Sequence, residues 1–184
     1  MQNLMAQTES TMQANTSKER ITWFSMWFLG AVASFGAAFF PMFYRLIDSR
    51  NKHFRREAEF EKQIADSLTK KGRNVPEIAN PTYMNAKAWA ASIILIIPAF
   101  IIDYYLSKDL LVHEKRQDAF LAAAFPSRMF MPQAIPIKKY VLISIVTLGV
   151  GGIYWLYKVA NLYNAHFKAE WKLEKEIACL MEET

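Results

Sequence analysis

The sequence predicts an all-α integral membrane protein with three transmembrane helices and additional amphipathic surface helices. Hydrophobic residues make up 53% of the chain and are gathered into blocks, whereas a soluble domain spreads them at helix or strand period. The block at 140–157 holds eighteen residues without a charge, the length that a bilayer core requires of a helix. Two further uncharged blocks occupy 21–44 and 88–102, and the polar remainder carries nearly all the charge.

Residues 1–20 form a polar tail, and the first transmembrane helix is predicted over 21–45, with Thr16 and Ser17 as candidate caps. Small residues four positions apart, Gly30, Ser34 and Ala38, make one smooth stripe on that helix. We expect another helix to pack closely there. A signal peptide cleaved after Ala31-Val32-Ala33 is an alternative, which the continuing apolar run opposes.

The segment 46–80 is a charged helix followed by a connection, with Gly72 as the stop. It either continues the first helix or lies separately on lipid headgroups. The second transmembrane helix is predicted over 81–107, with Asn80 as its cap and Pro98 as the cause of a bend.

Residues 108–138 are predicted to form an interfacial loop with a short helix, because several prolines interrupt the apolar residues there. The third transmembrane helix covers 139–159, with Lys138, Lys139 and Lys158 at its edges. An amphipathic extension at 160–184 continues it without a break.

The third block also carries a resemblance. Thr147-Leu148-Gly149, followed by the run from Gly152 to Lys158 (GIYWLYK), resembles the T-L-G and Y-W-x-Y signature of a prokaryotic membrane-protein family of unknown function. The similar region covers about 140–165. The resemblance implies a small helical membrane protein and brings no reaction or ligand with it.

The net charge of +5 suits loops that face anionic lipid headgroups. A nucleic-acid-binding protein would show a basic face with reading elements, and the sequence shows none. Lys and Arg are most frequent in 46–80, just behind the first hydrophobic block. This asymmetry favours a multi-pass protein of the cell membrane with its N-terminus outside and its C-terminus in the cytoplasm.

The sequence offers few candidates for a catalytic, cofactor-binding or metal-binding site. Cys179 is the single cysteine, which excludes an internal disulfide and a cysteine-built metal site. With three spans, His53 and His166 would lie on one side of the membrane and His113 on the other. We therefore expect no metal site, no cofactor and no catalytic residues.

Asp103 follows a strongly apolar run and is the candidate functional acid, as a proton or cation site. The alternative is a structural role at headgroup level, paired with Lys108, Lys138 or Lys139. Gly149 and Gly152 either open the third helix for a substrate or, as we expect, let a neighbouring side chain pack closely.

These features predict a non-catalytic accessory subunit of a multi-subunit membrane complex, such as a respiratory complex or a membrane monooxygenase. Its partners would be other membrane subunits and the lipid bilayer, without a nucleic acid or a small-molecule substrate. The alternative from another class is a small homo-oligomeric channel or transporter that uses Asp103. A lipid-surface scaffold is a third hypothesis.

Overall fold

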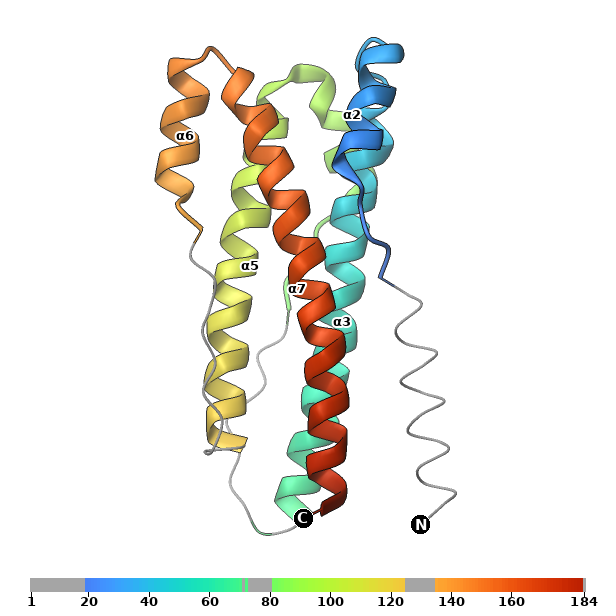
Figure 1. Ribbon diagram of the computed structural model, residues 1–184, viewed down its shortest axis with the longest axis vertical. Helices are drawn as coiled ribbons and strands as arrows, with labels where there is room; N and C mark the ends of the chain where they lie inside the picture. The colour runs from blue at the N-terminus through green and yellow to red at the C-terminus, as the bar shows by residue number, and fades with distance from the viewer. Residues whose placement is uncertain (1–18, 71, 73–80, 125–134, 184) are drawn as a thin grey trace.

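The protein is described by a computed structural model in which every regular element of the described residues is a helix (Figure 1). The structure describes residues 19–70, 72, 81–124 and 135–183. The predicted N-terminal tail, the candidate caps Thr16 and Ser17, and Asn80 lie outside these ranges. The elements are α2 (Phe24–Ala33), α3 (Phe39–Lys70), α4 (Ala86–Ser92), the 3-10 helix η1 (Ile93–Leu95), α5 (Ile97–Ala124), α6 (Ile137–Val146) and α7 (Val150–Glu183).

The all-α prediction is confirmed, but the three continuous membrane rods are not observed. Each hydrophobic block folds back on itself: α2 turns into α3, α4 with η1 turns into α5, and α6 turns into α7. The three turns lie at the same end of the molecule, at the top of Figure 1. Within the described ranges, no helix has both the length and the apolar character needed to cross a membrane.

The first and third turns have the same construction. In Ser34-Phe35-Gly36 and in Thr147-Leu148-Gly149, the last two residues have positive φ angles. Each glycine N–H donates to the carbonyl five residues earlier, at 2.7 and 2.8 Å, which is the bond that closes a Schellman motif. Each hydroxyl then accepts from the N–H four residues later, at 3.0 Å in the first turn and 2.7 Å in the third. A hydroxyl, a bulky apolar residue and a glycine therefore end one helix and start the next.

The second hairpin uses other residues. Ile96 has a φ angle of 63° and connects η1 to α5, so Pro98 stands in the first turn of α5, where its missing N–H is harmless. The predicted helix start at Pro81 is wrong: residues 81–85 are not helical, and Asn85 caps α4 by accepting from the Ala88 N–H at 3.1 Å.

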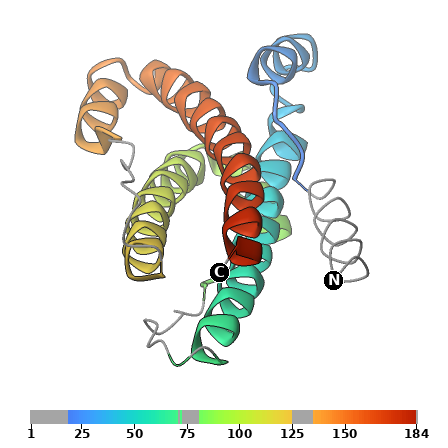
Figure 2. The same ribbon diagram turned by 60° about the horizontal axis from the view of Figure 1, so that its bottom comes forward.

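The long helices α3, α5 and α7 run side by side from the turns to the opposite end (Figures 1 and 2). α3 contains both the end of the first hydrophobic block and the charged segment, so the structure has the first of the two alternatives for that segment, a helix continuous with the end of the block. α5 extends to Ala124, and the part of the predicted interfacial loop from residue 108 to 124 is therefore helical. Two groups of buried apolar side chains join the three helices, one near the turns around Met42, Ile102 and Trp155 and one near the far end around Ile64 and Ile177.

The three long helices share one sequence register, counted from the turns. Tyr44, Tyr104 and Tyr157 each stand eight positions after the positive-φ residue that ends the turn, namely Gly36, Ile96 and Gly149. These tyrosines are exposed to the same degree, at 39%, 40% and 40%. Nine positions further along each helix stands a histidine.

Candidate metal centre

The three histidines of the chain meet in the middle of the bundle. His53 on α3, His113 on α5 and His166 on α7 are all buried, and one ring nitrogen of each lies within 4.8 Å of the others. The expectation that His113 lies on the other side of a membrane from His53 and His166 is therefore wrong. It assumed that each block crosses the membrane, whereas a hairpin returns the chain to the side from which it came.

The turns explain why the histidines coincide in height. Each histidine stands 17 positions after the turn: His53 after Gly36, His113 after Ile96 and His166 after Gly149. At about 1.5 Å per residue, this places all three about 25 Å from the apolar end of the bundle. Three parallel helices that start at one level therefore bring three imidazoles into one plane.

Two carboxylates orient the rings. Glu19 Oε1 lies 2.5 Å from His53 Nδ1, and Glu114 Oε1 lies 3.3 Å from His166 Nδ1. Because a carboxylate accepts a hydrogen bond, Glu19 keeps the ring proton of His53 on Nδ1 and leaves its Nε2 with a free lone pair. A carboxylate behind the histidine is the usual arrangement for a metal-binding imidazole.

His53 Nε2 lies at distances from the other two Nε2 atoms that suit a metal ion. His53 Nε2 lies 3.0 Å from His166 Nε2 and 3.4 Å from His113 Nε2. Ligands about 2.1 Å from a zinc-like ion are about 3.0 Å apart at a right angle and about 3.4 Å apart at the tetrahedral angle. Two lone pairs at 3.0 Å repel each other unless a cation or a proton lies between them.

Glu57 offers a fourth ligand, one helical turn after His53. Its Oε2 lies 2.7 Å from His113 Nε2 and 3.5 Å from His53 Nε2. Only 4% of the residue is exposed, and neither carboxylate oxygen has a hydrogen-bond partner among the described residues. A buried carboxylate without hydrogen bonds is costly, and either a cation or a proton shared with His113 Nε2 would offset that cost.

Acidic side chains outnumber basic ones around the histidines. The buried glutamates are Glu19, Glu57, Glu61, Glu114, Glu170 and Glu174. Arg56 pairs with two of them, reaching Glu19 at 3.0 Å and Glu174 at 2.8 Å. The other buried arginine, Arg50, is engaged by Asp109 at 2.6 Å. This surplus of carboxylates favours the binding of a cation.

Burial shifts the protonation of two histidines in the direction that metal binding requires and that of two nearby glutamates in the opposite direction. Desolvation lowers the pKa of His53 well below its usual value and that of His113 to about 4, so both rings are neutral. A neutral imidazole is the form that binds a metal. Desolvation also raises the pKa of Glu57 and, together with the charge of Glu57, raises that of Glu61 to about 7.

A small hollow leads to the centre from the surface. Its wall includes Glu57 and His113 from the centre and Glu61, Arg116 and Pro81 around them. A ligand position on the ion that faces this hollow would be accessible to water.

The small-residue positions singled out from the sequence lie far from this centre, in the hairpins. A Cβ added at Gly30 would stand 3.4 Å from Ala38 Cβ, and Ser34 caps α3. The three small residues therefore contact one another within the first hairpin. Gly149 lies in the third turn. Gly152 lies against the Phe100 ring of α5, which would be 2.2 Å from an added Cβ.

The candidate acid Asp103 is 2% exposed and lies between the core residues Ile102 and Leu106 along α5. Its Oδ1 has no hydrogen-bond partner in the described part of the chain. Asp103 is therefore buried within the chain and is not one of the residues grouped at the histidine centre.

Sequence reasoning missed the centre, although the chain contains a signal for it. His53 and His166 are each followed four positions later by a glutamate, Glu57 and Glu170, and His113 by Gln117. In a helix, residues four apart lie on one face. Each of these polar pairs begins 17 positions after the residue that ends a turn, which is Gly36, Ile96 or Gly149. The pairs therefore mark the three helix faces that meet.

Comparisons with known proteins add no relationship: no family model, curated protein or solved structure matches this chain.

Proposed function

We propose that this protein binds one divalent first-row transition-metal ion through His53, His113, His166 and Glu57. The observation that carries the proposal is the approach of His53 Nε2 to His166 Nε2 at 3.0 Å while the Nδ1 atom of each ring faces a glutamate. A cation between the two Nε2 atoms removes the repulsion of their lone pairs, as a shared proton would.

The ligand types narrow the choice of metal. Three imidazoles and one carboxylate suit Zn²⁺, Fe²⁺ or Co²⁺ better than Ca²⁺ or Mg²⁺, which prefer oxygen ligands only. The hollow beside Glu57 and His113 supports an ion that keeps one exchangeable water, and Glu61 stands there as an acceptor for its proton.

Titration with Co²⁺ tests the proposal directly, because its visible absorption reports coordination by nitrogen and oxygen. Full-length protein, purified in detergent and stripped with a chelator, is expected to bind one equivalent with a saturable change in absorption. The His166→Ala variant should lose this change, whereas Lys168→Ala, an exposed position on the same helix, should retain it.

Zn²⁺ should displace Co²⁺ and abolish the absorption at one equivalent. Equal binding by the wild type and the His166→Ala variant would contradict the proposal, as would the absence of saturable binding by the wild type.

The accessory-subunit hypothesis stays a prediction, and its proposed docking stripe at Gly30 is occupied within the first hairpin. Native electrophoresis in a gentle detergent tests it by showing whether the chain migrates with larger, unlike subunits. The channel alternative requires Asp103 to face the axis of an oligomer, and the burial of Asp103 inside its own chain argues against that arrangement.

A further inference from the structure

The end of the bundle that carries the three turns is covered by exposed apolar side chains. Phe35 and Leu148, at the tips of the first and third hairpins, are 102% and 96% exposed, and Ile96 of the second is 69% exposed. The other large apolar residues exposed near the tips are Met26, Leu29, Val32, Ile94, Leu95, Ile97, Leu142, Ile145, Val146 and Val150. An apolar surface of this extent marks an interaction site.

No charged residue interrupts this surface. The sequence has no Asp, Glu, Lys or Arg between Arg20 and Arg45, between Lys87 and Asp103, or between Lys139 and Lys158. Protein interfaces normally include a polar rim and hydrogen bonds. An uncharged apolar end formed by three separate hairpins is therefore better matched to the hydrocarbon core of a lipid bilayer than to a protein partner.

The depth of the apolar end matches one leaflet of a bilayer. Each tyrosine stands eight positions after its turn, as Tyr44 does after Gly36. Along a helix this corresponds to a depth of about 12 Å. Half of a bilayer core is about 15 Å thick. The histidines lie about 13 Å beyond the tyrosines, which places them outside the hydrocarbon.

The residues at the tyrosine level are those that favour a membrane interface. Tyr44, Tyr104 and Tyr157 form a ring at one height on the three long helices. Lys158 follows Tyr157, and its Nζ lies 5.5 Å from the centre of the Tyr154 ring. Lys138 and Lys139 are exposed in the first turn of α6. These cations are positioned for anionic headgroups.

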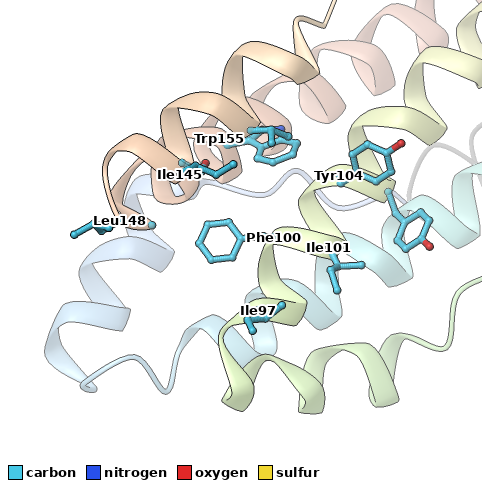
Figure 3. Close-up of a pocket in the computed structure, with 11 residues that line it drawn as sticks. Ile97, Phe100, Ile101, Tyr104, Ile145, Leu148 and Trp155 are labelled. Carbon is cyan, nitrogen blue, oxygen red and sulfur yellow. The ribbon is translucent and has the colours of Figure 1, made fainter.

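A groove between the second and third hairpins continues the apolar surface inward. Figure 3 shows Phe100 at its centre, between Ile97 of α5 and Leu148 of the third turn. Its volume is about 520 Å³, and Tyr104 and Trp155 complete its wall near the tyrosine level. A groove that is open sideways at this depth would be filled by acyl chains.

We propose that the three hairpins insert together into a single leaflet of a lipid bilayer, so that the far ends of α3, α5 and α7 and the histidine centre lie on one side of the membrane. The backbone at the tips supports this assignment: Phe35, Ile96 and Leu148 adopt positive φ angles that bulky residues avoid. The turns thus hold large apolar side chains at the outermost points. The inference does not depend on metal binding.

Vesicle flotation tests insertion. Purified full-length protein is expected to float with vesicles of phosphatidylcholine and phosphatidylglycerol when detergent is removed. The Phe35→Asp, Leu148→Asp double variant should lose at least ten-fold in the floating fraction. The matched control, Gln63→Asp with Thr69→Asp, changes two exposed neutral residues at the opposite end of α3 and should float as the wild type does.

Circular dichroism establishes that each variant retains its helices. Flotation of the folded tip variant at the level of the wild type would overturn the proposal. So would failure of the wild type to float, which is the result expected if another protein subunit covers the tips.

The side of insertion is tested with single cysteines in a Cys179→Ser background. Lys62→Cys, Ala122→Cys and Lys168→Cys lie on the three long helices beyond the tyrosine level, and all three positions are exposed. A membrane-impermeant maleimide should label all three from the same side of sealed vesicles. Three membrane crossings would instead place Ala122→Cys on the opposite side, and that labelling pattern would overturn the proposal.

Discussion

His53 Nε2 lies 3.0 Å from His166 Nε2 although the two residues are 113 positions apart in the sequence. A cation held between these two nitrogens would connect α3 to α7. We therefore predict that Zn²⁺ at 100 times its dissociation constant raises the free energy of unfolding by about 2.7 kcal/mol. For a chain of this size, the melting temperature should rise by about 5 to 10 °C.

Thermal melting with and without chelator measures this effect. The His53→Ala variant should show the same melting temperature in Zn²⁺ and in chelator. A wild-type protein that is indifferent to Zn²⁺ would contradict the prediction.

Glu19 holds the N-terminal segment against the centre. Its carboxylate contacts His53 Nδ1 at 2.5 Å and Arg56 Nη1 at 3.0 Å, and it accepts from Trp171 Nε1 at 2.7 Å. Replacing Glu19 with Gln removes the negative charge behind the imidazole, and we expect metal affinity to fall by about 10- to 100-fold. The Glu59→Gln variant, at an exposed position of α3, should bind as the wild type does. Metal competition with a chromophoric chelator measures both affinities.

Gly152 provides the space for Phe100. A methyl group at position 152 would stand 2.2 Å from the ring, so Gly152→Ala should lower the free energy of unfolding by about 1 to 3 kcal/mol. In the Phe100→Ala background the same substitution should cost little, because the ring is gone. Denaturation of the two single variants and the double variant measures this coupling. Additive losses would show that the helices do not approach as described.

Arg50 connects α3 to α5 and to the segment before α4. Its guanidinium reaches Asp109 Oδ2 at 2.6 Å and donates to the Thr82 carbonyl at 2.6 Å, and its side chain is 3% exposed. Asp109→Asn leaves this buried cation without its anion, and we expect a loss of about 3 kcal/mol in the free energy of unfolding.

The exposed pair of Lys52 and Asp48 gives the comparison for Arg50, because its ions remain in water. Asp48→Asn should change the free energy of unfolding by about 0.5 kcal/mol or less. Chemical denaturation measures both variants, and equal effects would contradict the assigned difference in burial.

The sequence alone determined that the chain is helical and that its apolar residues form three uncharged blocks. It also marked Gly72 as the end of the charged helix, and α3 does end nearby, at Lys70. These features depend on neighbours in the chain, on composition and on helix-ending residues, so local patterns suffice to find them.

Only the tertiary structure decided whether each block is one rod or a hairpin. The same Thr147-Leu148-Gly149 that fits within a transmembrane helix also forms a turn, because a glycine after a bulky residue can take a positive φ angle. The positive φ angles of Leu148 and Gly149 reverse the direction of the chain. The turn at Ile96 does the same in the second block and brings His113 from an expected position across the membrane to within 3.4 Å of His53, and no local pattern encodes a contact between residues so far apart in sequence.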